Sequence, residues 1–432
     1  MKEREQSRVL NNIVSPYGLA MISYAFFLFA CLIPPSVYRR YINEPDLMFL
    51  DPATILFYTL CVVAFLTGAC FAGWLMPPIR LGRLSLKTKV SSTAFLLMPL
   101  TLGLVITIIS DLKLVRSSPS ILLFLFAQQG QDLKRAVAYQ VDQNVTLPPL
   151  ALIGIIWWAF WRYPDIGLRG WRKRLLLITL SVAVIAVIAS SILTLSRSLL
   201  MLVVCGIAVL YVTRKTLRER IGFNFIFKGS IAIVFCISIL FFSFSFLRGT
   251  DSLNGQIYQL LGYTVASYNR LAAIVNGSLH FPFAGKGIYL SGFLAFNKTF
   301  NRFIPLNIVM NLPSPIDAFD SPFGAITRAG LDGSLVWLGA FGDIFSELGW
   351  FSCLFVLGYG MLYGVVWNWV RRGKALGIVL YPCFAFCVLF WFGGNILLGS
   401  DPVVLLVVAV LLAGYELILV KPLGIGMLAA LD

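Results

Sequence analysis

Charged side chains are scarce in this chain. Only 12% of its 432 residues are Asp, Glu, Lys or Arg, whereas 59% are hydrophobic, and the mean hydropathy is +0.87. So few charges do not cover the surface of a soluble protein of this length. Many apolar runs have the length of a helix that crosses a bilayer. The composition therefore predicts an all-α, polytopic membrane protein.

Motifs of several well-defined activities are also missing. The chain has no Asp-x-Asp, no Walker loop and no Gly-x-Gly-x-x-Gly before a strand, which argues against a metal-dependent nucleotide-sugar transferase and an ATPase. It has one histidine, His280, and its eight cysteines all fall inside apolar runs. We therefore expect no metal and no other cofactor. The net charge of +15 is scattered over loops, so no nucleic-acid partner is expected.

The surplus of Lys and Arg lies mainly in short turns between apolar runs. Positive residues favour the cytoplasmic side of a membrane, so these turns predict orientation. Basic and mixed-charge loops alternate, which predicts roughly ten spans with both termini in the cytoplasm. The expected spans cover approximately residues 16–37, 53–76, 91–110, 148–161, 175–193, 199–213, 229–247, 349–370, 375–398 and 403–420. Trp157, Trp158 and Trp161 fit the aromatic belt at the membrane interface.

This pattern divides the chain into three parts. Residues 1–247 hold the first seven spans and short basic turns, and residues 348–432 hold the last three spans. Residues 248–347 form a large extracytoplasmic loop, which alone is long enough to carry a site. Within it, residues 256–277 have the apolar spacing of an amphipathic helix, expected at the membrane surface, and a Pro- and Asp-rich cap follows.

Several arginines near the outer face are candidate ligands of a diphosphate. Arg197 lies at the tip of a predicted helix hairpin, and Arg248 follows the seventh span. A guanidinium fork matches phosphate oxygens, which makes both suitable for a lipid diphosphate. The alternative is an arginine that only extends to the interface. Arg270, on the polar side of the amphipathic helix, is a further candidate.

Aromatic side chains of the amphipathic helix are candidates for binding sugar. Tyr263 and Tyr268 have faces on which a sugar ring can stack, and the alternative is anchoring at the membrane interface. Asp317 and Asp320 in the cap are candidates for binding sugar hydroxyls. The alternative for these aspartates is ordinary turn formation.

Three residues are candidate acid–base catalysts. His280 is the only imidazole and is able to act as a general base, although a lone loop histidine is often incidental. Asp343 and Glu347 lie one helical turn apart where the eighth span begins. Two acids on one helix face beside a membrane boundary suggest a base, or partners for the arginines.

Three stretches of the chain resemble the bacterial O-antigen polymerase (Wzy-type) family of oligosaccharide repeat-unit polymerases. They are Ser196-Arg197, Arg248-Gly249 with the helix through Tyr268, and residues 341–350 leading into the glycine-rich segment 358–364. The resemblance implies a membrane-embedded glycosyltransferase of GT-C-like fold in the bacterial inner membrane. Its active region would face the periplasm.

The same resemblance implies a reaction and a set of partners. Glycan carried on undecaprenyl diphosphate would be transferred as a block onto a new lipid-linked repeat unit, without a metal. Arg197, Arg248 and Arg328 would hold the diphosphate leaving group, and His280 or a carboxylate would activate the acceptor hydroxyl. Membrane lipid and a chain-length regulator are further expected partners. The alternatives are an O-antigen ligase-like transferase, a flippase or transporter of lipid-linked sugar, and a non-catalytic assembly component.

Overall fold

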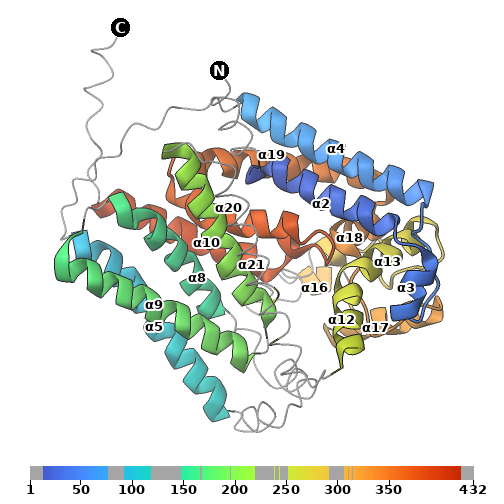
Figure 1. The fold of residues 1–432 in the computed structure, drawn as a ribbon, viewed down its shortest axis with the longest axis horizontal. Helices are drawn as coiled ribbons and strands as arrows, with labels where there is room; N and C mark the ends of the chain where they lie inside the picture. Colours follow the sequence, from blue (N-terminus) through green and yellow to red (C-terminus); the bar gives the residue numbers. More distant parts are fainter. Residues whose placement is uncertain are drawn as a thin grey trace.

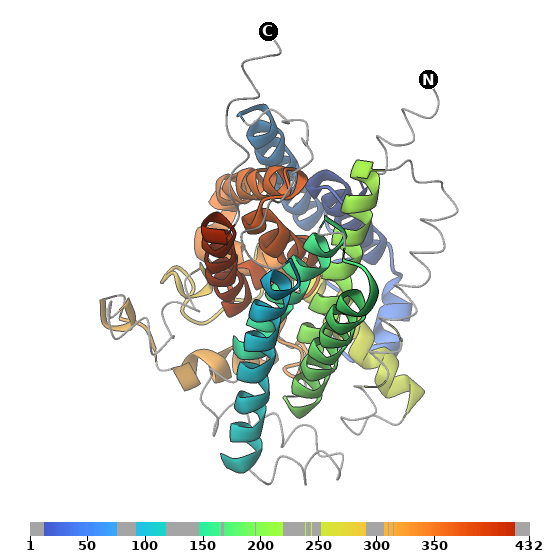
Figure 2. The same ribbon diagram turned by 90° about the vertical axis from the view of Figure 1, so that its left-hand side faces the viewer.

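The computed structural model describes residues 13–75, 92–117, 147–165, 168–194, 196–218, 252–290, 306–309, 311–313 and 315–419, with residues 238 and 243. Every regular element in these ranges is helical (Figures 1 and 2), as predicted. The α-helices are α2 (Pro16–Cys31), α3 (Pro35–Tyr41), α4 (Pro52–Leu75), α5 (Ser92–Ser117), α8 (Leu147–Arg162), α9 (Gly170–Leu193), α10 (Arg197–Arg218), α12 (Leu253–Tyr263), α13 (Val265–Val275), α16 (Leu306–Val309), α17 (Pro315–Arg328), α18 (Gly339–Leu348), α19 (Ser352–Arg371), α20 (Ala375–Leu389) and α21 (Ser400–Leu419). Short 3-10 turns are η2 (Tyr163–Asp165), η3 (Gly349–Phe351) and η4 (Ile396–Leu398).

Six stretches of the described chain are long and apolar enough to cross a membrane, or seven if the bent pair α2–α3 counts as one span. This supports a multi-pass membrane protein. The expected fourth and ninth spans are the shorter helices α8, of 16 residues, and α20, of 15 residues. The expected seventh span lies almost wholly outside the described residues. A count near ten and the GT-C-like arrangement therefore stay predictions.

The expected first span is broken. Helix α2 ends at Cys31, and α3 leaves it at an angle of 94°. Pro34 and Pro35 cause this break, because proline lacks a backbone N–H and disfavours helical geometry in the residue before it. The turn carries α3 across the end of the bundle, where it contacts α12.

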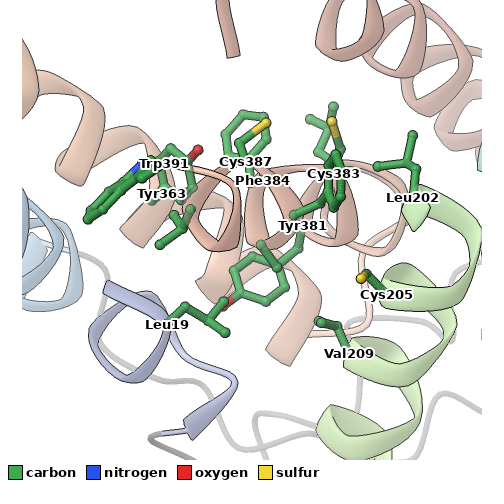
Figure 3. Close-up of a cluster of buried hydrophobic side chains, with 14 of the residues drawn as sticks. Leu19, Leu202, Cys205, Val209, Tyr363, Tyr381, Cys383, Phe384, Cys387 and Trp391 are labelled. Atoms are coloured by element: carbon green, nitrogen blue, oxygen red, sulfur yellow. The ribbon is translucent and has the colours of Figure 1, made fainter. Parts of the chain in front are cut away.

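Helix α20 is the central helix of the bundle. Its residues from Gly377 to Val388 are all buried, because α2, α8, α10, α19 and α21 surround it. Figure 3 shows Tyr381 and Phe384 of α20 close to side chains of α2, α10 and α19. Ser23 of α2 donates a hydrogen bond of 2.6 Å to the carbonyl of Val388, one of the last carbonyls of α20. A helix so enclosed needs an apolar side chain on every face.

Glycines bring α4 and α19 into backbone contact. A Cβ atom on Gly68 would lie 2.1 Å from the carbonyl oxygen of Leu357, and one on Gly360 would lie 2.0 Å from that of Phe65. Gly364, one turn after Gly360, meets Ala69 and Ala72 in the same way. Small residues at this spacing allow close packing of membrane helices. The glycine-rich segment 358–364 thus has a packing role.

Basic turns gather at one end of the bundle, which we call the basic end. Arg162 forms an ion pair of 2.6 Å with Glu416 and donates a hydrogen bond of 2.8 Å to the carbonyl of Gly373. Arg214 pairs with Asp165 at 2.7 Å. These contacts join the turn after α8, the last turns of α10 and α21, and the turn between α19 and α20.

Helices α3, α12, α13, α17 and α18 gather at the opposite end (Figure 1), which we call the cap end. The segment 390–399 also lies there, because the N–H of Ala340 in α18 donates to the carbonyl of Trp391 at 2.8 Å. Where the structure describes them, turns that the sequence assigns to opposite membrane faces therefore lie at opposite ends of the bundle.

Two local predictions are wrong. The amphipathic helix expected over residues 256–277 is two helices, α12 and α13, separated at Thr264, and residues 265–274 of α13 are all buried. Helix α13 is therefore a core helix instead of a surface helix. Trp157 and Trp158 have no exposed surface and Trp161 has 5%, so they pack within the bundle instead of forming an interfacial belt.

Candidate functional site

Arg197 begins helix α10, at the tip of the hairpin with α9. Its guanidinium reaches α12, where Nη2 donates a hydrogen bond of 3.1 Å to Oε1 of Gln259. The guanidinium carbon also lies 5.8 Å from the ring centroid of Tyr263. A guanidinium is a permanent cation whose N–H groups match the oxygens of a phosphate, so Arg197 is a candidate for binding an anionic ligand.

A second aromatic ring continues from Tyr263 across the cap end. The rings of Tyr263 and Trp337 have centroids 6.3 Å apart, and 38% of Trp337 is exposed. Gly394 allows the indole to take this place, because a Cβ atom there would lie 2.7 Å from the ring. Partly exposed aromatic faces of this kind can stack on a sugar ring.

Asp343 of α18 lies near the same point, because a Cβ atom on Gly394 would also be 4.0 Å from its Oδ2. Its Oδ2 accepts a hydrogen bond of 3.1 Å from the backbone N–H of Asn395. The side chain of Asn395 is in turn 3.3 Å from the hydroxyl of Tyr359 on α19, with the amide as donor. The turn formed by Gly394 and Asn395 thus holds the carboxylate beside the aromatic rings.

These contacts define one continuous group, which we call the Arg197–Asp343 row: Arg197, Gln259, Tyr263, Trp337, Asp343 and Asn395. Its members come from α10, α12, the segment before α18, α18 itself and the segment after α20. The row combines a cation for a phosphate, aromatic faces for a sugar and a carboxylate able to accept a proton.

Glu347 has a different environment from Asp343, although both are on α18. Its two carboxylate oxygens accept hydrogen bonds of 2.8 Å from the backbone N–H groups of Gly287 and Tyr289. Burial, together with the charges of Asp343 and Glu347, raises the pKa of the Tyr289 hydroxyl above its ordinary value. Glu347 therefore anchors the 287–289 segment, which leaves Asp343 as the candidate base of the two acids.

His280 lies in the segment after α13, and its side chain is exposed. It takes no part in the described contacts of the Arg197–Asp343 row. It lines a cavity of about 640 Å³ together with Lys286 and Ser346. The imidazole is thus accessible to a ligand, as a role in acid–base chemistry requires.

Arg270 requires a correction. Its side chain and that of Glu44 have no exposed surface, and they form an ion pair of 2.9 Å. Arg270 also donates to the carbonyls of Ala266 and Asp332, each at 2.8 Å. A guanidinium enclosed in this way is inaccessible to a lipid diphosphate, so Arg270 leaves the candidate site. We call this group, with Asn269 of α13, the Glu44–Arg270 cluster.

The Glu44–Arg270 cluster joins three segments of the cap end. Asn269 donates to Oε1 of Glu44 at 3.0 Å, and the backbone N–H of Asp332 donates to Oε2 of Glu44 at 2.8 Å. Burial opposes ionisation of Asp332, but hydrogen bonds from Tyr258 and Ser334 and the charge of Arg270 outweigh it and lower the pKa of this carboxyl. Burial and the bond to Asp332 raise the pKa of Tyr258 to about 12.

Tyr268 also leaves the candidate site. It has no exposed surface and packs edge-on against the rings of Phe27, at a centroid distance of 5.1 Å, and Tyr58, at 5.8 Å. A ring enclosed on these sides has no free face for a sugar. Tyr268 therefore stabilises the contact of α13 with α2 and α4.

The remaining predicted residues lie elsewhere in the cap end or outside the described ranges. Arg328 is exposed on the last turn of α17, where its Nε donates to the carbonyl of Gly324 at 3.2 Å. Asp317 and Asp320 are on α17, but their side chains lie outside the described part. Arg248 also lies outside the described residues.

Three members of the row were not predicted from the sequence. Gln259, Trp337 and Asn395 belong to no recognised motif. One available signal was the Gly-Gly pair before Asn395, because adjacent glycines inside an expected span favour a break in the helix. Helix α20 does end before them, at Leu389.

No protein-family model, curated protein or solved structure matches the chain. The resemblance to Wzy-type polymerases therefore depends on the residues quoted for it. Among the residues that the structure describes, no group of three or more His, Cys, Asp or Glu side chains is arranged to hold a metal ion.

Proposed function

We propose that this protein polymerises oligosaccharide repeat units carried on undecaprenyl diphosphate into a surface polysaccharide. The observation that carries the proposal is the Arg197–Asp343 row, in which a cation, two aromatic rings and a carboxylate adjoin one another at the end of a membrane bundle. In the transfer, the leaving diphosphate and the attacking acceptor hydroxyl lie on opposite sides of the anomeric carbon of the donor sugar. The row offers a matching group for each.

The distribution of charge supports an orientation for this activity. Lys and Arg concentrate at the basic end, in the turns 162–174, 214–218 and 371–374. By the positive-inside rule the basic end faces the cytoplasm, so the cap end faces the periplasm of a bacterial inner membrane. Both termini are then cytoplasmic. Lipid diphosphates, and not nucleotide sugars, are the donors available on that side.

The proposed reaction is a single displacement at the anomeric carbon of the donor glycan. The acceptor hydroxyl oxygen forms the new glycosidic bond as the bond between that carbon and the diphosphate breaks. The hydroxyl proton passes to the Asp343 carboxylate. Arg197 stabilises the undecaprenyl diphosphate that leaves, a task for which Arg248 and Arg328 remain candidates. No metal takes part in this scheme.

The aromatic part of the row positions the sugars. Tyr263 and Trp337 provide ring faces between the cation and the carboxylate. Asp317 and Asp320 remain candidates for binding sugar hydroxyls. Held in this way, the acceptor hydroxyl and the anomeric carbon meet without the entropic cost of a free encounter.

A ligase-like transferase is a second candidate function. It is favoured by one observation, the exposure of His280 in a cavity beside α18. Such an enzyme would transfer the finished glycan to a different acceptor, with His280 as the base. A flippase is less well supported, because Arg162 and Glu416, a charged pair between α8 and α21, neutralise each other at the basic end.

Surface glycan from a strain that lacks the gene distinguishes these functions. Loss of a polymerase leaves single repeat units exported and attached, whereas loss of a flippase leaves the units inside the cell. Complementation with Arg197→Gln should give the single-unit pattern at normal protein level. The matched control is Arg172→Gln, an exposed arginine at the basic end, which should restore long chains. Long chains in the Arg197→Gln strain would overturn the proposed role of the row.

A further inference from the structure

The cavity beside α18 is separate from the contacts of the Arg197–Asp343 row. It has a volume of about 640 Å³, within the range of small-molecule sites in proteins. Its lining combines Phe281, Phe283 and Phe345 with the polar side chains His280, Lys286 and Ser346. Aromatic walls with a few polar groups are typical of a site that binds sugar rings.

The charge in this cavity is positive. Lys286 is exposed, and its Nζ lies 5.5 Å from the ring centroid of Phe283. Within the described part of the chain, no carboxylate forms an ion pair with Lys286. On α18, the Glu347 carboxylate accepts hydrogen bonds from the backbone N–H groups of Gly287 and Tyr289. An anionic group that enters the cavity would meet the ammonium group of Lys286 in its lining.

The segment that carries Lys286 is held in an uncommon backbone shape. Phe283 has a φ of 62°, a left-handed conformation that is costly for an aromatic residue, and Gly285 and Gly287 have φ values of 79° and 78°. The hydroxyl of Tyr289 donates to the carbonyl of Pro282 at 2.6 Å, which closes the segment. Strain of this kind persists where surrounding contacts maintain it, and it is frequent at ligand-binding sites.

The cavity also adjoins the proposed site through one helix. Ser346, which lines the cavity, is three residues after Asp343 on α18, so the two side chains are neighbours on the helix surface. A glycan whose reacting sugar lies at Asp343 can therefore place a following sugar near Ser346. The order along the glycan becomes diphosphate, reacting sugar and bound sugar.

We propose that this cavity binds a carboxylate-bearing sugar, a hexuronate, of the glycan, with Lys286 as the partner of the carboxylate and the phenylalanine rings against the sugar. This inference rests on the polymerase proposal, because it identifies a sugar class of the same substrate. A phospholipid headgroup would offer Lys286 a similar negative charge. The test therefore separates the sugar from the lipid.

The experiment measures binding of tetramers of glucuronate and galacturonate to the purified full chain in phosphatidylcholine nanodiscs, by saturation-transfer NMR and titration calorimetry. Wild type should bind at least one uronate tetramer more tightly than the neutral glucose and galactose tetramers. Lys286→Gln should weaken uronate binding about tenfold or more, because a charge-assisted contact is lost. Lys286→Arg should retain most of it. Arg40→Gln, an exposed cation on α3, is the control for net charge and should change nothing.

Three results would overturn the assignment. They are equal affinity for uronate and neutral tetramers, unchanged uronate binding in Lys286→Gln, and displacement of bound uronate by added phosphatidylglycerol with the same dependence on Lys286, which would assign the lysine to lipid. Chain lengths in the strain that lacks the gene test the polymerase separately. Uronate binding that depends on Lys286, together with long chains in that strain, would uphold the cavity and overturn the polymerase.

Discussion

Two arginines at the cap end have opposite environments. Arg270 is fully buried on α13 and holds Glu44 at 2.9 Å, with further bonds to backbone carbonyls. Arg197 is partly exposed at the start of α10, beside an amide and an aromatic ring. The same type of side chain thus joins three segments in one place and, in the proposed function, binds the diphosphate in the other.

This difference separates stability from activity. Removing a partner of the Glu44–Arg270 cluster leaves a buried charge without compensation, which affects the folded state. Removing Arg197 takes away a charge near the surface and should affect the reaction alone. Variants of the two regions should therefore give different combinations of protein yield and product.

Arg270→Met should have the largest effect. It leaves Glu44 buried and unpaired, which costs about 3–5 kcal/mol of folding free energy. Thermal unfolding of the detergent-purified protein should show a much lower midpoint, or the variant should not accumulate. Arg328→Met, an exposed arginine, is the control and should change stability by less than about 0.5 kcal/mol. A fully stable Arg270→Met protein would contradict the structural role of the cluster.

Asp343→Asn should have the second largest effect, on the turnover rate. An amide keeps the shape of the side chain and cannot accept the hydroxyl proton, so the turnover rate should fall about a hundredfold or more at normal protein level. Rates are measured from product chain length with time. Glu347→Gln is the comparison, since its carboxylate binds the 287–289 backbone. Glu347→Gln should lower the unfolding midpoint more than the turnover rate. If Glu347→Gln lowered mainly the rate and Asp343→Asn mainly the midpoint, Glu347 would be the base and Asp343 the structural acid.

Trp337→Ala should moderately weaken the binding of the glycan substrate. Loss of one stacking aromatic ring costs about 0.5–1.5 kcal/mol of binding free energy in addition to the loss of buried apolar area. KM should therefore rise several-fold with little change in kcat. Trp171→Ala, an exposed tryptophan at the start of α9, is the matched control. An unchanged KM in Trp337→Ala would remove the ring from the proposed sugar path.

Acid should have the smallest effect, through Asp332. Its pKa is lower in the folded chain than the ordinary value of about 3.9. Ionised Asp332 therefore stabilises the fold at pH values above its ordinary pKa. This contribution is lost as the pH falls through the lower pKa of the folded chain. Asp332→Asn should therefore show less loss of thermal stability than wild type below about pH 4. Parallel curves for the two proteins would contradict the pKa assignment.

Local patterns in the sequence predict much of the helical framework and the place of Arg197. Apolar runs define the spans, and the hairpin tip follows from the polar residues between two of them. Contacts between distant residues are not predictable in this way. Arg270 and Glu44 are 226 positions apart, so spacing on one helix gives no indication that they meet.

The incorrect prediction that α13 lies at the membrane surface also results from contacts between residues distant in the sequence. Its polar residues suggested a surface helix, because a polar side chain normally faces water. Asn269 and Arg270 instead form hydrogen bonds inside the protein with Glu44, Pro45 and Asp332. Burial of a charge is possible only with such partners, and the partners come from other segments.

The most direct test of the central claim is reconstitution of the purified chain in liposomes with undecaprenyl-diphosphate-linked repeat units. The Arg197–Asp343 row predicts a ladder of polymer lengths with wild type and with Arg172→Gln. It predicts only single units with Arg197→Gln, whose unfolding midpoint should equal that of wild type. A ladder in the Arg197→Gln sample would contradict the proposed role of the Arg197–Asp343 row, and single units alone with wild type would contradict the proposed polymerase.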